Sequence, residues 1–205
     1  METLAKLFGG QARVKIMRLF LLNPEQFFSI EEIISRSRVM KAGARRELNA
    51  LIGMGFVKQK LQTIEGSRGG KRKVPVWSLN MHFPYLGSIK DLLVDPHLLL
   101  QEDLIQRFKP IGKIQLMVVA GVFIGDDKSR ADLLLVGDKI KKTTLQQVVK
   151  ALEAEIGKEL DYVVFDTKEF IYRMSMYDKL VCDILDFPNQ KLVDIGQLST
   201  RITQK

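Results

Sequence analysis

Residues 41–80 read KAGARRELNALIGMGFVKQKLQTIEGSRGGKRKVPVWSLN and carry the clearest structural signals in the N-terminal part of the chain. Apolar residues recur at helical spacing between Lys41 and Met54, and Gly55 follows as a stop signal. Residues 56–63 and 73–80 are typical of two β-strands around a glycine-rich, basic tip. The apolar face of the helix carries Ala44, Leu48, Leu51 and Ile52. The stretch therefore predicts a helix followed by a β-hairpin.

Two further helix signals precede this stretch. Residues 12–22 show apolar side chains at helical spacing, and Asn23-Pro24 ends the helix because the residue before a proline avoids the α region. Ser29 and Glu32 have the spacing of a capping box, which opens a short helix through Ser35. Three helices and a hairpin in this order are typical of a winged helix-turn-helix. Its third helix enters the major groove of DNA, and its wing meets the backbone or the minor groove.

The charge of the chain is divided unevenly. Residues 1–82 hold 15 Lys and Arg against 6 Asp and Glu, a net of +9, whereas residues 83–205 hold 17 against 18, a net of −1. A basic surface favours a polyanionic partner, because cations on the phosphates release counterions. We therefore expect double-stranded DNA to bind the N-terminal part. The groove-facing candidates are Lys41, Arg45, Arg46 and Asn49, and the wing candidates are Arg68, Lys71, Arg72 and Lys73.

The composition argues against several other classes of protein. The single cysteine, Cys182, allows neither an intramolecular disulfide nor a cysteine-rich zinc site, and the two histidines lie too far apart to suggest a metal site. No apolar run reaches the roughly 18 residues of a membrane span, and the first residues contain no signal-peptide core. We expect a cytoplasmic protein without a membrane partner, a bound metal or a cofactor.

A helical linker is expected over residues 83–110. Tyr85, Ile89, Leu92 and Leu93 indicate one amphipathic helix, and residues 98–108 indicate a second before Pro110. Two consecutive helices with apolar faces favour a packed spacer or a dimer contact over a flexible connection.

From Ile111 onward the pattern changes to buried strands that alternate with helices. Strands are predicted at 114–122, 131–136, 161–165 and 191–194. Helices are predicted from Thr143 or Thr144 to 156, from an opening at 167–170 onward, and at 177–185. Residues 111–205 should therefore form a mixed sheet with helices. Together with the winged helix of residues 1–82, this places the chain in the α+β class.

Residues 121–134, GVFIGDDKSRADLL, resemble the signature of the nucleotidyltransferase fold of DNA polymerase β. In that fold a Gly-Ser pair holds a nucleotide phosphate, and an Asp-x-Asp strand holds two magnesium ions, because residues two apart on a strand face the same way. Here Val122 follows Gly121 in place of the serine, and Arg130 stands at the first ligand position. Only Asp132 and, as the third carboxylate, Asp161 remain in register. A guanidinium cannot coordinate magnesium, so we expect no catalytic residues.

The same residues define a candidate ligand pocket of Gly121, Arg130, Asp132 and Asp161. One interpretation is that Arg130 meets a bound phosphate, which makes a nucleotide a candidate effector. The other is that Arg130 is an ordinary surface residue. The neighbouring Asp126-Asp127 pair has two interpretations. It could supply a carboxylate in place of the missing metal ligand, or its side chains could stabilise a turn.

Several segments resemble one family in particular. Phe8-Gly9-Gly10-Gln11-Ala12-Arg13-Val14-Lys15, Arg45-Arg46-Glu47-Leu48-Asn49-Ala50-Leu51 and Gly53-Met54-Gly55-Phe56-Val57 resemble the arsenic-repressor type of winged helix. Asn80-Met81-His82-Phe83-Pro84 and Glu159-Leu160-Asp161-Tyr162-Val163-Val164-Phe165 are similar to prokaryotic transcriptional regulators that join such a winged helix to a nucleotidyltransferase-like domain. This resemblance implies regulation of transcription and dimerisation.

The main hypothesis is a sequence-specific DNA-binding transcriptional regulator that acts as a homodimer on a two-part operator. Its C-terminal domain would serve dimerisation or ligand sensing. Two alternatives stay open. One is an active nucleotidyltransferase that adenylylates a target and is guided by the winged helix. The other is an antitoxin-like module whose winged helix binds a protein.

Overall fold

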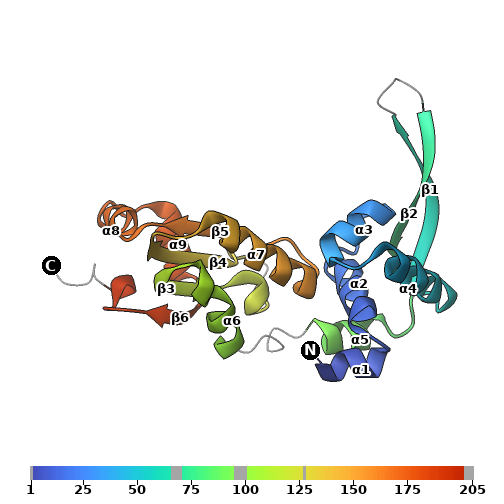
Figure 1. The fold of residues 1–205 in the computed structure, drawn as a ribbon, viewed down its shortest axis with the longest axis horizontal. Coiled ribbons are helices and arrows are strands. Elements are labelled where there is room, and N and C mark those ends of the chain that lie inside the picture. Colours follow the sequence, from blue (N-terminus) through green and yellow to red (C-terminus); the bar gives the residue numbers. More distant parts are fainter. Residues whose placement is uncertain (1, 66–70, 95–100, 127, 201–205) are drawn as a thin grey trace. The chain divides into compact units, whose positions relative to one another are not determined.

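The computed structural model describes residues 2–65, 71–94, 101–126 and 128–200. The chain forms two compact units, residues 1–95 together with 150–158 and residues 96–149 together with 159–205. Both units mix helices with strands, as expected (Figure 1). Three sequence-based predictions lie outside the described residues: the hairpin tip with Arg68, Asp127 of the acidic pair, and positions 98–100 of the second linker helix.

The first unit begins with helices and continues into a two-stranded antiparallel sheet (Figure 1). Its elements are α1 (Glu2–Phe8), α2 (Gln11–Leu22), α3 (Ile30–Ser37), α4 (Lys41–Gly53), β1 (Val57–Glu65), β2 (Lys71–Leu79) and α5 (Leu86–Leu93). The predictions for α2, α3, α4 and the hairpin are confirmed. Helix α1 was missed because its buried side chains, Leu4 and Ala5, are adjacent in the sequence and show no helical period.

An aromatic contact joins the helices of this unit to its hairpin. The rings of Phe20 and Phe28 meet edge to face with centroids 5.7 Å apart, and both side chains are fully buried. Phe28 also pairs with Trp77 of β2 through two backbone hydrogen bonds of 2.9 Å, one in each direction. Because a buried polar backbone must be paired, this bridge sets the place where the hairpin leaves the helices.

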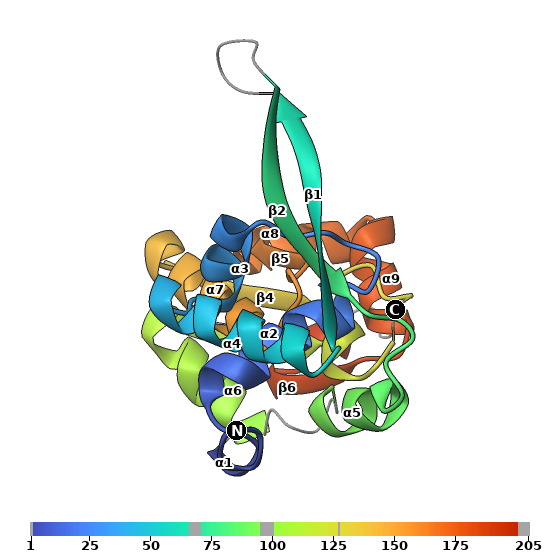
Figure 2. The same cartoon turned by 90° about the vertical axis from the view of Figure 1, so that its right-hand side faces the viewer.

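The hairpin projects well beyond α3 and α4 (Figures 1 and 2). Its strands pair from Val57 opposite Leu79 to Glu65 opposite Lys71. On β1 only Val57 is buried, and on β2 burial is confined to Val76 and Leu79 near the base. The outer half of the hairpin therefore carries no core and presents both of its faces to solvent.

Helix α5 belongs to the first unit, which shifts the expected domain boundary at residue 82. Arg18 of α2 is buried and donates a 2.7 Å hydrogen bond from Nε to the carbonyl of Leu93. A buried guanidinium needs such acceptors, so this bond ties the end of α5 to α2. The linker expected over residues 83–110 is consequently divided, with α5 in the first unit and α6 (Gln101–Phe108) in the second.

The second unit is built on a four-stranded mixed sheet of order β5-β4-β3-β6 (Figure 1). Strand β4 pairs antiparallel with β3 and parallel with β5, and β3 pairs antiparallel with β6. The strands are β3 (Lys113–Val119), β4 (Leu133–Asp138), β5 (Tyr162–Phe165) and β6 (Gln190–Asp194), and the helices after α6 are α7 (Lys142–Ile156), α8 (Thr167–Ser175) and α9 (Lys179–Asp186). Residues 150–158, which include the second half of α7, group with the first unit and so depart from the domain expected over 111–205. The predicted strands and helices of this part are confirmed, with ends that differ by a few residues.

Both faces of the two central strands are buried. Helices α8 and α9 cover one face, where their side chains pack in one cluster with Leu116, Val118, Leu134 and Val136. The alternate residues Met117, Val119, Leu133 and Leu135 are buried as well. Such double burial explains why these strands read as continuous apolar runs. Across the described part of the chain, no helix is both long enough and apolar enough to cross a lipid bilayer.

The capping box at the start of α3 allows a prediction about the stability of the first unit. Ser29 Oγ accepts from the Glu32 N–H at 3.3 Å, and a Glu32 carboxylate oxygen accepts from the Ser29 N–H at 2.7 Å. We expect Ser29→Ala to lower the free energy of unfolding of the first unit by about 1 kcal/mol. The single tryptophan, Trp77, lies in this unit and reports its urea unfolding by fluorescence.

Ser88→Ala is the matched control, since Ser88 is exposed on α5 and its side chain caps no helix. An equal loss in both variants would contradict the capping role of Ser29.

Candidate nucleic-acid interface

Helix α4 has one buried and one exposed face, as the sequence predicted. Ala44, Leu48 and Leu51 are buried against the rest of the unit, while Ile52 is half-buried. The four groove-facing candidates are all exposed: Lys41, Arg45, Arg46 and Asn49. Three cations and one amide, the two chemistries that read guanine and adenine edges, therefore share one helix surface.

The structure shows a buried residue of α4 that contacts one of these candidates and was not itself among them. Glu47 is buried, and its two carboxylate oxygens accept from two arginines, Arg13 Nε of α2 at 2.7 Å and Arg46 Nε at 3.2 Å. A signal was present in the sequence, because Glu47 lies three residues after Ala44 and four before Leu51, on the edge of the apolar face. Its partner Arg13 is 34 positions away, which no local pattern reveals.

This ion pair restrains Arg46. The Arg46 side chain is 79% exposed, while that of Glu47 is 5% exposed. Glu47 engages Nε of Arg46, so the guanidinium is contacted at one edge while most of the side chain is exposed. An arginine restrained in this way loses less side-chain entropy when it binds a planar partner.

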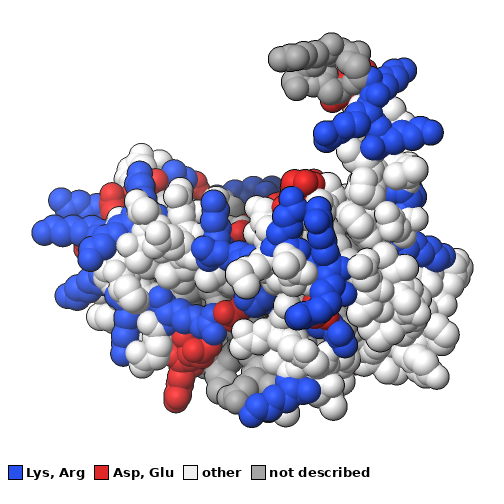
Figure 3. Space-filling view, turned by 45° about the vertical axis from the view of Figure 1, so that its right-hand side comes forward, with Lys and Arg blue, Asp and Glu red and all other residues white. Residues whose placement is uncertain are grey.

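The outer hairpin carries cations on both faces. Successive residues of a strand point to opposite sides, so Lys71 and Lys73 share one face and Arg72 lies on the other. All three side chains are exposed, and Figure 3 shows Lys and Arg side chains gathered near the end of the hairpin. Lys58 and Lys60 of β1 are exposed too and were missed by the sequence reasoning. Lys60 Nζ lies 3.2 Å from the ring centroid of Phe27, so this lysine makes a cation–π contact.

In the second unit, the candidate pocket residues Gly121, Asp132 and Asp161 lie close together. The Asp132 side chain forms a brace, meaning that it joins two backbone segments by hydrogen bonds. Asp132 is buried, and its oxygens accept from the Val122 N–H at 2.8 Å and the Asp161 N–H at 2.9 Å. Gly121 has a φ of +53°, and a Cβ there would collide with the Asp132 carboxylate. Asp132 thus holds the turn after β3 against the start of β5, and both of its oxygens have protein partners.

Arg130 and the acidic loop have internal partners as well. Arg130 Nε forms a 2.8 Å ion pair with Asp183 of α9, and the Arg130 side chain is 53% exposed. Asp126 accepts from the Lys128 N–H at 3.0 Å and from the Ser129 hydroxyl at 3.3 Å, which is turn geometry. Over the residues for which placements are given, no group of three or more His, Cys, Asp or Glu side chains is arranged to hold a metal ion.

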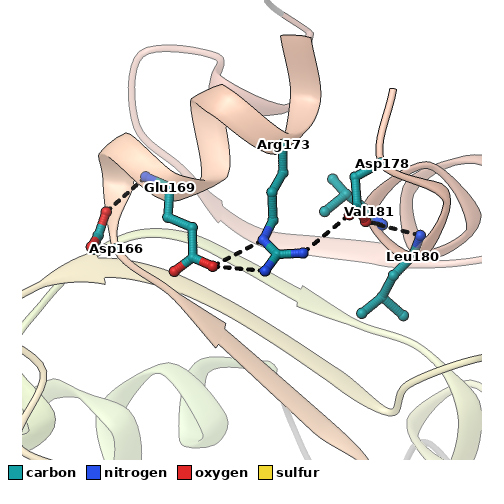
Figure 4. A network of polar contacts seen from close by, with 6 residues as sticks. All are labelled: Asp166, Glu169, Arg173, Asp178, Leu180 and Val181. Atoms are coloured by element: carbon teal, nitrogen blue, oxygen red, sulfur yellow. Dashed lines mark hydrogen bonds and ion pairs between the residues drawn. The ribbon is translucent and has the colours of Figure 1, made fainter. Parts of the chain in front are cut away.

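A polar network on α8 and α9 also serves the fold (Figure 4). Arg173 bonds Glu169 at 2.9 Å and Asp178 at 3.0 Å, and hydrogen bonding to Glu169 is the main cause that raises the pKa of Arg173. Asp166 caps α8 by accepting from the Glu169 N–H at 2.7 Å, and Asp178 caps α9 by accepting from the N–H groups of the next turn. These acids neutralise helix N-termini and one guanidinium, so their chemistry is used within the fold.

A cavity of about 430 Å³ lies at the other end of β4 from the candidate pocket. It lies where the parallel strands β4 and β5 end, and Gly137, Lys142, Tyr162 and Asp166 are among its lining residues. Ligands of open α/β sheets commonly bind outside the carboxyl ends of parallel strands. Neither Arg130 nor Asp132 is among the lining residues of this cavity.

The brace at Asp132 generates a prediction. We expect Asp132→Asn to lower the local stability of the second unit by about 1–3 kcal/mol, because the amide nitrogen would face a buried N–H donor. Amide hydrogen exchange of β4 measures this change. Asp161→Asn is the control, since the Asp161 side chain is exposed. Stabilisation of the unaltered protein by millimolar magnesium that is lost in Asp132→Asn would contradict this structural role.

Comparison of the chain with protein-family models, curated proteins and solved structures found no match. The geometry of the two units is therefore the basis of the functional proposal.

Proposed function

We propose that the first unit is a winged helix-turn-helix that binds double-stranded DNA, with α4 in the major groove and the β1–β2 hairpin as the wing. The observation that carries this proposal is the exposed polar face of α4 beside a projecting hairpin with cations on both faces. A major groove admits one α-helix, and a wing reaches the adjacent backbone or minor groove.

The side chains of α4 fit the reading of base edges. The terminal nitrogens of Arg46 match the O6 and N7 acceptors of guanine, and the amide of Asn49 matches the N6 and N7 edge of adenine. Lys41 and Arg45 flank them and fit phosphates or further bases. We therefore infer that α4 carries sequence specificity.

The wing fits the phosphate backbone. Lys71, Arg72 and Lys73 have no core to support and project to both sides of a narrow ribbon. A ribbon with cations on both faces can approach phosphates of both strands at once. Such contacts raise affinity for all sequences alike and make binding dependent on salt.

We further propose that the whole chain is a transcriptional regulator that acts as a homodimer on a two-part operator. The second unit then resembles a nucleotidyltransferase-like domain without catalysis. The antiparallel and parallel strand pairs around β4 support this resemblance, and the engaged carboxylate of Asp132 and the Arg130–Asp183 pair argue against two-metal chemistry.

The first prediction from this proposal concerns specificity. Arg46→Ala should lower the discrimination between the preferred site and single-base variants by about 1–3 kcal/mol at one position. Competition binding with a site obtained by selection from random DNA measures this loss. Arg46→Lys is the matched variant, because it keeps the charge and loses the bidentate geometry. Discrimination retained in both variants would show that Arg46 does not read a base.

The second prediction concerns affinity without specificity. Lys71→Ala or Arg72→Ala should weaken binding to all DNA sequences about equally and lower the slope of log K against log salt by about 1 each. Titrations at several salt concentrations measure both quantities. Lys168→Ala is the control, since Lys168 is an exposed lysine of α8 in the second unit. An equal effect at Lys168 would indicate general charge attraction, and an absence of DNA binding would overturn the proposed function.

A further inference from the structure

The first unit contains a cavity of about 340 Å³ below the proposed recognition helix. Helices α1, α2, α4 and α5 contribute to its lining together with the segments that flank the hairpin. Its apolar wall includes Met17, Leu51, Phe56 and Phe83, and the rings of Phe56 and Phe83 meet edge to face with centroids 5.5 Å apart. A volume of this size with an apolar lining is typical of small-molecule sites.

The charged lining of the cavity has one sign. Lys6 of α1 and Arg13 of α2 line it, and no acidic residue is among its described lining residues. A ligand that fills an apolar cavity with a cationic edge needs an apolar body and an anionic group. A carboxylate is the smallest organic group that a guanidinium can bind in bidentate fashion.

Arg13 connects this cavity to the exposed face of α4. The guanidinium that lines the cavity donates from Nε to Glu47, and the other oxygen of Glu47 accepts from Arg46. A carboxylate bound to Arg13 competes with Glu47 for the same guanidinium. Glu47 then depends more strongly on Arg46 for neutralisation, so Arg46 is drawn toward Glu47 and away from DNA, although no ligand atom contacts that residue.

We propose that this cavity binds a small organic carboxylate with an apolar body, and that binding lowers the affinity of the protein for its specific DNA site through Arg13, Glu47 and Arg46. The coupling to DNA rests on the proposed function, while ligand binding itself does not. By linkage, specific DNA must lower the affinity for the carboxylate by the same factor.

The first experiment measures the ligand site alone. Decanoate is titrated by calorimetry into the full chain without DNA, and decanol is the matched probe without charge. One decanoate should bind per chain, and decanol should bind at least about tenfold more weakly, because it lacks the charge-assisted bond to Arg13. Equal affinity for the two probes, or no decanoate binding, would overturn the proposal.

Two variants place the ligand in the cavity. Ile89→Trp fills the space from α5 and should abolish decanoate binding while DNA binding stays unchanged. Met54→Glu puts a negative charge at a rim residue that is 51% exposed, so the fold should tolerate it, and decanoate affinity should fall several-fold relative to Met54→Gln. Persistence of decanoate binding in both Ile89→Trp and Met54→Glu would overturn the assignment. A changed oligomeric state of Ile89→Trp with decanoate binding retained would identify the cavity as a self-association face instead.

The last experiment tests the coupling. Saturating decanoate should lower affinity for the selected DNA site at least about fivefold and leave affinity for random DNA unchanged. Glu47→Gln should still bind decanoate but lose this response, because the link to Arg46 is weakened. A response of full size in Glu47→Gln would overturn the coupling route. Decanoate binding in a protein that binds no DNA would support the cavity assignment and overturn the proposed function.

Discussion

The buried carboxylate of Glu47 is the interaction on which the proposed interface depends. It lies on the inner edge of α4, where two guanidinium groups from different helices neutralise it. A buried charge is tolerated only with such partners, and the less exposed of the two, Arg13, comes from a helix other than α4. The position of α4 on α2 and the orientation of Arg46 are therefore set together. In the proposed complex, the fold of the unit and the direction of its outer arginine cannot be varied independently.

The second unit uses its acidic residues in the same way, as parts of the fold. Asp132, Asp166 and Asp178 each accept hydrogen bonds from backbone N–H groups that would otherwise lack partners. Asp166 and Asp178 cap helix N-termini and Asp132 is itself buried, so these positions favour Asp for structural reasons. This explains how the segment 121–134 can resemble a metal-binding signature while its carboxylate has another role.

Local patterns in the sequence predicted most of the fold. The Ser29–Glu32 spacing, the helix from Lys41 and the apolar run of β4 each depend on neighbours within a few positions, where helical and strand periods apply. The pairing of Glu47 with Arg13, of Arg130 with Asp183 and of Arg18 with Leu93 joins residues far apart in the chain. No period encodes such contacts. For this reason the exposed candidates on α4 were found, whereas the residue that restrains Arg46 and the place of α5 were not.

The structure also changes the meaning of the basic N-terminal part. Its net charge of +9 counts every cation alike, but several of them serve the fold. Arg18 is buried, Arg13 is paired with Glu47, and the Arg36 guanidinium lies 5.3 Å from the ring centroid of Phe28. Exposed cations gather on α4 and on the hairpin, the two surfaces of the proposed DNA contact, and further exposed cations such as Arg38 lie outside them. Because counterion release depends on the cations that reach phosphates, the salt dependence of binding should follow these two surfaces and not the net charge of the unit.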